Sequence, residues 1–537
     1  MSNLVSPDEY ELAGRKSSID SSEETYNLND EDYEIQTLTG KPSYNRERPV
    51  AHRSLRNYLP LRIRRLITQL RPRRVSRSRL PRHSCWRNPR IRRLLLLCFH
   101  IFLGGLLFLI AFTAAFRPSY TKLPPHYHAL YQRIILHSNE LGRGNPDNEK
   151  IFIAISLYDK AGHLASGSYG QSVLDLIDLL GPDNVFLSIY ENDSGKEGED
   201  ALMRLKEKVT CKNEIVYEEQ VSMDKHPRYP VPDGTERVKR IPYLADLRNR
   251  ALKPLDVSLD TVFDRVLFLN DVYFNPVDAV QLLFSTNVNE KGKAQYVAAC
   301  ATDFVNPFKF YDTYATRDLE GYSMGVPFYP WFSSVGSAQS RQDVLDQKDA
   351  VRVKSCWGGM VAFDGRYIQH LTTSQLDEPP TTVRFRGEDE AYYDASECCL
   401  IHADIARNAH TDAFGEDNHI YLNPYVRVGY SPSTLSWLAF SRRFERLFVF
   451  PHWLANTFAR MPAYNPHRLV REGDEYEGER WVQDFNLPGN GSWQVEKMVA
   501  RNGLFCGIRK MEVLVDQPRT GDKNWEKISV PPGSKLW

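Results

Sequence analysis

The chain has 537 residues, enough for two or three domains or for one large domain with appendages. Hydrophobic residues make up 42% and charged residues 25%, an ordinary globular balance that argues against a fibrous or compositionally biased protein. The formal net charge is zero, but this value hides a strong segregation of charge along the chain.

The first 93 residues have the pattern of a disordered cytosolic tail. Residues 1–40 hold ten acidic residues, and residues 51–93 hold fifteen arginines and no acid. Blocks of like charge that are poor in apolar periodicity are typical of disordered segments. The arginine block alone would suit a nucleic acid. The segment that follows favours anionic lipid headgroups instead, so we expect no nucleic-acid partner.

A membrane-spanning helix is predicted for residues 94–116, which contain no formally charged side chain. At about 1.5 Å per residue this helix reaches roughly 34 Å, enough to cross a hydrocarbon core of about 30 Å. A buried core helix seldom runs this long without a charge, and a cleaved signal peptide would begin near the first residue. The twenty residues before the span (74–93) contain eight arginines, and the twenty after it (117–136) contain only three Lys or Arg residues. This difference in positive charge predicts a single-pass type II orientation.

The cysteines and glycosylation sequons agree with a lumenal location for the C-terminal part. Six of the eight cysteines would lie in the oxidising lumen, where fifteen disulfide pairings are open to them. None forms a CxxC pair, so a zinc site is not indicated. Sequons at Asn192 and Asn490 fit lumenal exposure.

Residues 117–149 read as a short stem, after which strands and helices alternate. Apolar, β-branched runs predict strands at 151–158, 185–192, 214–219, 265–271 and 295–301. Helical spacing of apolar residues predicts helices at 171–180, 198–209, 241–252 and 276–285. The alternation predicts an α/β, Rossmann-type fold for residues 150–430, with a mostly parallel sheet and helices on both faces. Residues 431–537 show no clear period and are expected to be a C-terminal extension packed on this domain.

Sheets of this kind bind ligands at the carboxyl ends of their strands. No GxGxxG sequence follows the first strand and no Walker A motif is present, which disfavours dinucleotide enzymes and P-loop ATPases. A lumenal enzyme that uses a nucleotide sugar would need carboxylates for a divalent cation and a carboxylate beside the anomeric carbon.

The strongest candidate for a metal ligand is Asp271, which with Asn270 follows the apolar strand at 265–271. It should project from the carboxyl edge of the sheet, and Asp303, which follows the fifth strand in the same way, supports this interpretation. The alternative is that Asn270 and Asp271 only form a turn.

Arg248 is placed on the apolar stripe of the predicted helix 241–252. A guanidinium on a buried stripe requires an anionic partner. The partner is either a ligand diphosphate or a structural carboxylate, and the sequence leaves both open.

Two more segments carry candidate residues. Glu388 and Asp389 belong to a run of acids of which a helix dipole explains only one or two, so one of them is expected to face the reacting sugar. Trp357 precedes Gly358 and Gly359 and offers a stacking platform that a sugar can approach closely. A tight turn beside a core tryptophan is the alternative.

Several segments between residues 151 and 430 occur together in one order. They are FIAISLYDKAGHLASGSYGQSVLDLIDLLGPDNVFLSIYEND, LADLRNRAL, RVLFLNDVYF, CATDF, KSCWGGMVAFD and FRGEDEAYYDASECCLIHADI. Together they resemble the fungal capsule-associated α-1,3-mannosyltransferase family, glycosyltransferase family 69. The resemblance implies a type II Golgi membrane protein with a GT-A-like fold, a GDP-mannose donor, a mannoside or glycan acceptor and a divalent cation such as Mn²⁺. It also implies an α-1,3 linkage formed with retention.

The same resemblance assigns expected roles to residues. Asp271 stands where GT-A enzymes keep their acidic metal motif, although Asn270-Asp271-Val272 is not a full Asp-x-Asp. His402 matches in order the late histidine that many GT-A enzymes add to the metal, whereas alone it would be assigned a structural role. Glu388 and Asp389 match the family's acidic pair. The residues expected to bind the donor are Ser156, Tyr158, Glu191, Arg248 and Asn270, and those expected to bind the acceptor are Trp357, Gly358 and Gly359.

Two alternatives stay open. The donor could be another nucleotide sugar such as UDP-xylose. The incomplete Asp-x-Asp also allows a non-catalytic lumenal scaffold for polysaccharide assembly.

Overall fold

The structure, a computed structural model, describes residues 89–219, 221–257, 261–376, 379–409, 418–462, 465–484, 491–515 and 524–536. The predicted tail up to residue 88 therefore lies outside the described residues. By its internal contacts the chain forms one unit that includes Thr113–Trp537 and a second that holds the preceding helix as far as Phe112.

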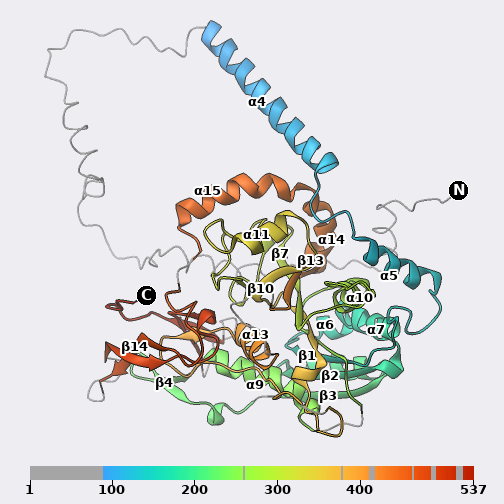
Figure 1. Ribbon diagram of the computed structural model, residues 1–537, viewed down its shortest axis with the longest axis vertical. Coiled ribbons are helices and arrows are strands. Elements are labelled where there is room, and N and C mark those ends of the chain that lie inside the picture. The colour runs from blue at the N-terminus through green and yellow to red at the C-terminus, as the bar shows by residue number, and fades with distance from the viewer. Residues whose placement is uncertain are drawn as a thin grey trace. The chain divides into compact units, whose positions relative to one another are not determined.

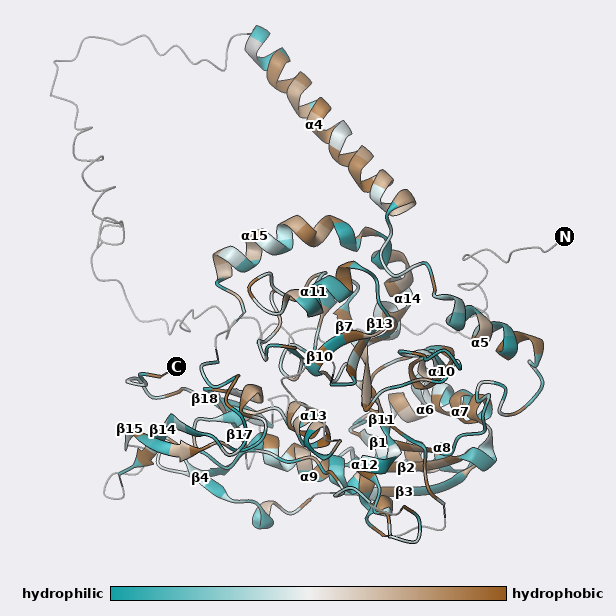
Figure 2. Ribbon diagram, in the orientation of Figure 1, coloured by the Kyte–Doolittle hydropathy of each residue, from teal (hydrophilic) through white to brown (hydrophobic). Residues whose placement is uncertain are grey.

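The helix α4 (Pro89–Phe116) covers the predicted span. Its segment Arg92–Phe116 is long and apolar enough to cross a membrane, and its most apolar stretch is not buried in protein. Figure 2 shows this helix as mostly apolar along its length. Length and composition are thus compatible with a single-pass anchor.

A ten-stranded sheet forms the centre of the larger unit (Figure 1). Its order is β3-β2-β1-β6-β11-β7-β13-β10-β9, with β8 paired to β7. The strands are β1 (Ile151–Leu157), β2 (Val185–Asn192), β3 (Lys212–Glu218), β6 (Arg265–Leu269), β7 (Ala298–Asn306), β8 (Lys309–Phe310), β9 (Arg317–Asp318), β10 (Val351–Ser355), β11 (Met360–Asp364) and β13 (Ile420–Gly429). The pairings make β8, β10 and β11 run opposite to the other seven, so the sheet is mostly parallel.

Helices cover both faces of this sheet. One face packs on α7 (Ser168–Leu180), α8 (Gly195–Lys206) and α10 (Pro276–Ser285), and the other on α9 (Arg240–Leu252) and α13 (Glu397–Asn408). The strand β1 serves both cores, because Ile153 and Ile155 point to the first cluster while Phe152 and Ala154 point to the second. Burial on both faces explains why this strand reads as one continuous apolar run.

The predicted α/β fold class with a mostly parallel sheet is confirmed, and the predicted strands and helices of residues 151–301 are all present. The sequence did not reveal that β11 inserts antiparallel between β6 and β7. A prediction that relies on alternating strands and helices assumes that each strand returns through a helix, and this strand does not.

Smaller elements complete the larger unit. In the segment predicted as a stem, α5 (Pro125–Leu136) buries Tyr127, Leu130 and Ile134. The remaining elements are α6 (His163–Ser166), β4 (Arg228–Pro230), β5 (Glu236–Val238), α11 (Ala338–Leu345), α12 (Gly365–Ile368), β12 (Asp394–Ala395), α14 (Pro432–Ser441), the 3₁₀ helix η7 (Arg442–Phe448), α15 (Val449–Ala459), β14 (Glu475–Gln483), β15 (Gly491–Val499), β16 (Gly507–Ile508), β17 (Met511–Leu514) and β18 (Trp525–Ile528).

Two disulfides settle part of the pairing that the sequence left open. Cys300–Cys356 joins β7 to the segment before β11, and Cys399–Cys506 ties α13 to the C-terminal extension. The pairing of β12 with β16 adds a second tie between the core and this extension.

The two sequons have different outcomes. Asn490 lies outside the described residues. Asn192 ends β2 and is only 6% exposed, with Ser194 fully buried, so the folded chain does not offer this sequon to solvent. In the folded chain the sequon at Asn192 therefore belongs to a buried strand end.

Candidate functional site

Three carboxylates gather where β1, β2 and β6 end. The parallel register sets Leu157 beside Glu191 and Ile155 beside Leu269, so these strands finish at a common edge. Asp159 follows β1, Glu191 lies near the end of β2, and Asp271 follows β6. Parallel strands of an α/β sheet present their ligand-binding groups at this edge.

Asp271 is the exposed member of the group. Its side chain is accessible to solvent, yet desolvation by the surrounding protein raises its pKa. The solvent exposure and the raised pKa are compatible if the carboxylate reaches solvent while protein atoms surround it on its other sides. The guanidinium of Arg248 lowers this pKa and the charge of Asp159 raises it, so both groups are electrostatic neighbours of Asp271.

Glu191 is fully buried, and neither of its carboxylate oxygens has a hydrogen-bond partner among the described residues. Burial raises its pKa to about 7, and the charge of Asp159 adds to the rise. Ser194 lowers this pKa, and its hydroxyl oxygen accepts a hydrogen bond from the backbone N–H of Asp159 at 2.8 Å. A Cβ atom on Gly198 would lie 2.7 Å from Glu191 Oε1, so only glycine lets α8 approach this closely.

The other two residues expected on the donor side lie at the same edge. Ser156 is half-buried near the end of β1, opposite Tyr190 of β2. Tyr158 is 50% exposed directly after β1. The structure therefore brings Ser156, Tyr158 and Glu191 together along two neighbouring strands.

Arg248 has the structural partner that the sequence left open. Its Nε donates to Glu397 Oε1 at 3.0 Å, and its Nη1 donates to Asn270 Oδ1 at 2.7 Å. Its guanidinium also lies 4.9 Å from the ring centroid of Trp357. Arg248 therefore fixes Asn270 beside Asp271, and its guanidinium, paired with Glu397, also lowers the pKa of Asp271.

The expectation that Trp357 forms a stacking platform is wrong. Its ring is 4% exposed, contacts Phe268 and Phe385, and carries Arg248 at its side. A sugar face has no access to a ring in this position. Its alternative as a core tryptophan holds, and the ring helps to position Arg248.

The adjacent glycines support the end of β6 rather than an exposed surface. Gly358 and Gly359 both have positive φ, of 59° and 65°. A Cβ atom on Gly358 would lie 1.9 Å from the carbonyl oxygen of Ala301, and the carbonyl oxygen of Gly359 accepts the N–H of Asn270 at 2.9 Å. The close approach predicted for these glycines is made to backbone.

His402 is not placed to bind a metal with Asp271, so that expectation is wrong. The side chain is fully buried on α13, its Nδ1 bonds to the carbonyl oxygen of Cys398 at 2.8 Å, and its Nε2 lies 3.7 Å from Cys300 Sγ. Burial lowers its pKa to about 4, so the ring is neutral. His402, Cys300 and Cys356 lie together, but the disulfide leaves no thiolate to join the histidine as a ligand.

Asp303 does not form a metal pair with Asp271 either. It lies within β7, fully buried, where the Tyr430 hydroxyl and the Asp312 N–H each donate to it at 3.0 Å. Burial raises its pKa to about 8, and the neighbouring Asp312 adds to the rise. A carboxyl that keeps its proton near neutral pH is a poor ligand for a cation.

In the loop 384–394, the acidic residues Glu388 and Asp389, which the sequence could not distinguish, have different surroundings. Glu388 is buried and paired with Arg386 at 3.0 Å and with Arg501 at 2.9 Å. Asp389 is exposed. Lys239 fixes the backbone of this loop, since its Nζ donates to the carbonyl oxygens of Glu388 and Glu390 at 2.7 and 2.8 Å.

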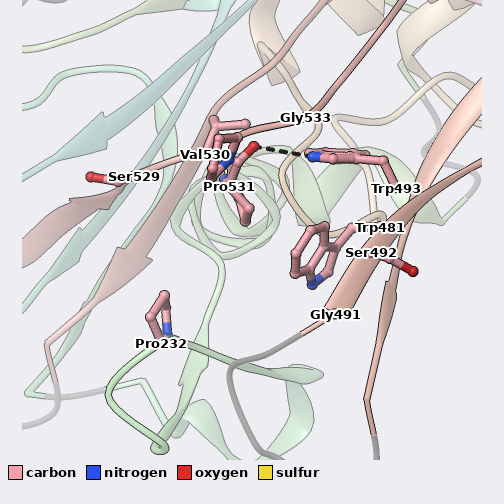
Figure 3. Close-up of a pocket in the computed structure, with 10 residues that line it drawn as sticks. Pro232, Trp481, Gly491, Ser492, Trp493, Ser529, Val530, Pro531 and Gly533 are labelled. Carbon is pink, nitrogen blue, oxygen red and sulfur yellow. Dashed lines mark hydrogen bonds between the residues drawn. The ribbon is translucent and has the colours of Figure 1, made fainter.

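A separate hollow of about 600 Å³ lies in the C-terminal extension (Figure 3). Trp481 and Trp493 line it, and Trp493 Nε1 donates to the carbonyl oxygen of Pro531 at 3.0 Å. Both rings contact Tyr392 of the loop 384–394. None of its lining residues comes from the edge formed by β1, β2 and β6.

The acidic edge fits a divalent cation that keeps part of its water shell and is bound by few protein ligands. Among the described residues, no three ligating side chains converge there closely enough to enclose an ion. A hard cation commonly keeps several waters and binds one or two carboxylates together with substrate phosphates. The exposed carboxylate of Asp271, with Asp159 nearby, suits that arrangement.

A mostly parallel sheet with acidic side chains at its carboxyl edge has the general arrangement of an α/β ligand-binding domain. Residues 150–404 match the model of a family described as Cryptococcal mannosyltransferase 1. This match confirms the predicted resemblance over residues 150–404.

Individual proteins show the same similarity. The chain is 27% identical over 180 residues to alpha-1,3-mannosyltransferase CMT1 of Cryptococcus neoformans, over 31% of this chain and 36% of that protein. The chain thus spans about a third of the length of this relative. Among solved structures, mannosyltransferase PcManGT from Pyrobaculum calidifontis in complex with GDP-Man and Mn²⁺ has a TM-score of 0.30 and 12% identity, over 64% of this chain and 77% of that one. TarS 1–349 of S. aureus has a TM-score of 0.27 and 12% identity, over 52% and 60%. These structural likenesses are too weak to carry an argument.

Proposed function

We propose that this protein is a type II Golgi membrane enzyme that transfers mannose from GDP-mannose to a mannoside or glycan acceptor. The product would carry an α-1,3 linkage. The observation that carries the proposal is the exposed carboxylate of Asp271 at the end of β6, inside a domain that matches a mannosyltransferase family. The helix α4 supports the anchor, because its segment Arg92–Phe116, which includes the predicted span 94–116, is long and apolar enough to cross a membrane.

In this proposal Asp271 holds a divalent cation such as Mn²⁺. The cation would neutralise the diphosphate that leaves when the glycosyl bond to the donor breaks. Arg248 orients Asn270 and adds a positive charge beside the diphosphate. Ser156 and Tyr158 are the accessible residues on the donor side and would meet the nucleoside, whereas Glu191 is fully buried and supports the strand end.

Asp389 is the better candidate of the acidic pair for the reacting sugar. Glu388 is engaged by two arginines, whereas Asp389 is exposed and belongs to the same clamped loop. The exposed carboxylate of Asp389 can contact a substrate without breaking the ion pairs that engage Glu388.

The test is a transfer assay with the full chain in nanodiscs, supplied with labelled GDP-mannose, simple mannosides and Mn²⁺, followed by NMR of the product linkage. Asp271→Asn should lower the transfer rate by about 100-fold or more, the loss expected when a main electrostatic group is removed. Asp264→Asn is the matched control, because Asp264 precedes the same strand at its opposite end.

Each outcome separates the alternatives. Full activity of Asp271→Asn would remove this residue from the metal site. Transfer from UDP-xylose but not from GDP-mannose would replace the proposed donor. If calorimetry detected no metal-dependent binding of any nucleotide sugar, the scaffold would be the correct function.

A further inference from the structure

The helix α15 buries polar side chains and exposes apolar ones, the opposite of an ordinary surface helix. Its two buried side chains are His452 and Asn456, one helical turn apart. Asn456 Oδ1 accepts the N–H of Val326 at 2.8 Å, and its Nδ2 donates to the carbonyl oxygen of His452. The outward side chains are mostly apolar, and Phe458 is 81% exposed. A soluble surface helix normally directs its apolar stripe inward and its polar side chains to water.

The apolar surface continues onto the neighbouring elements. We call it the aromatic face, defined by Trp437 and Phe440 of α14 and by Phe450, Trp453, Leu454 and Phe458 of α15, each of which is 39% exposed or more. Rings on each helix lie next to each other, with Trp437–Phe440 at 5.6 Å and Phe450–Trp453 at 5.8 Å. Figure 2 shows apolar residues on both helices.

The aromatic face rests on a rigid base. The 3₁₀ helix η7 joins α14 to α15, and its Glu445 accepts two hydrogen bonds from Arg427 of β13, at 2.6 and 3.0 Å. Both side chains of this pair are almost fully buried. Exposure of the face is therefore a property of the folded domain and not of a loose flap.

The chain leaves the predicted span beside this face. The helix α4 ends at Phe116, and the N–H of Ser119 donates to the carbonyl oxygen of Arg442, the first residue of η7, at 3.3 Å. Arg442 Nη1 in turn donates to the carbonyl oxygen of Tyr120 at 3.0 Å. Three residues reach at most about 11 Å, so η7 lies within this distance of the end of the span wherever the helix points.

We infer that the aromatic face lies in the interface of the bilayer that α4 crosses. The inference depends on the proposed membrane anchor. Trp and Phe side chains suit this interface, since their rings enter the boundary between headgroups and acyl chains. The three residues that follow the end of α4, up to Ser119, keep the aromatic face close to the membrane. A soluble partner would therefore have to compete with the membrane for this face. The domain is thus held by two contacts, and its orientation to the membrane is fixed.

The experiment uses the full chain in liposomes that contain phosphatidylcholine with a spin label high on its acyl chain. An environment-sensitive fluorophore is attached to Phe458→Cys, or to Val499→Cys as the control, since Val499 is 63% exposed on β15. Both proteins also carry Cys85→Ser and Cys98→Ser, because the remaining free cysteines, Cys211 and Cys398, are buried. Flotation of the liposomes reports anchoring independently of the label.

The expected result is flotation with a blue-shifted, several-fold more strongly quenched label at position 458 than at position 499. Adding Phe450→Glu and Trp453→Glu should abolish the difference without releasing the protein from the liposomes. Flotation with equal quenching at both positions overturns the inference and leaves the anchor intact. A blue shift at 458 without lipid quenching overturns it in favour of a protein partner, including a second copy of this chain. Failure to float overturns the anchor and the inference together.

Discussion

The substitution Glu191→Gln should stabilise the protein in a pH-dependent way. Folding raises the pKa of this carboxyl from 4.5 to about 7, mainly through burial. Below pH 4.5 both the folded and the unfolded states hold the proton, so burial carries no ionic penalty. The penalty grows as the pH rises through this interval and is complete above pH 7. At 1.36 kcal/mol for each pH unit it amounts to about 3 kcal/mol.

Glutamine cannot ionise, so the variant escapes this penalty. Urea unfolding of the solubilised full chain should show little difference from the parent protein at pH 5 and a gain of up to about 3 kcal/mol at pH 8. Glu197→Gln, at an exposed position on the adjacent α8, is the control substitution. A stability difference of the same size at both pH values would refute the assigned pKa and its cause.

Three further predictions concern paired and unpaired groups. Asp389→Asn should lower kcat in the transfer assay with an unchanged unfolding midpoint, whereas Glu388→Gln should lower the midpoint because two arginines each lose one of their carboxylate partners. Glu445→Gln should cost about 3–5 kcal/mol of unfolding free energy by leaving a buried arginine unpaired, against about 1 kcal/mol or less for the exposed Glu496→Gln. His402→Gln should leave the Mn²⁺ concentration needed for half-maximal activity unchanged, and an increase would restore the histidine to the metal site.

The sequence predicted the sheet well where burial on both faces imposes a continuous apolar run. The strand β13 escaped detection because it contains Asn423 and Arg427, both fully buried. Asn423 donates to the hydroxyl of Tyr127, and Arg427 pairs with Glu445. These partners are remote along the chain, so no local pattern shows that the polar residues belong to a core.

The site was predicted only in part, for a related reason. Asp271 and Asp303 both follow apolar runs, but β6 ends at Leu269 while β7 continues to Asn306, which leaves one acid beyond its strand and the other inside. His402 could be placed in the order of the family's motifs, yet order does not say which side of α13 faces the edge of the sheet. Asp159 was missed, although it follows the first strand much as Asp271 follows the fourth.

The helix α9 connects the two parts of the proposed site. Lys239, just before it, holds the backbone of the loop with Glu388 and Asp389, and Arg248, near its middle, holds Asn270 beside Asp271. Nine residues at about 1.5 Å each separate the two anchors by roughly 13.5 Å along the helix. The proposal gives these segments different roles, with Asp271 at the cation that meets the leaving phosphate and Asp389 at the reacting sugar. Because α9 supports both segments, a substitution that shifts this helix should disturb both roles together.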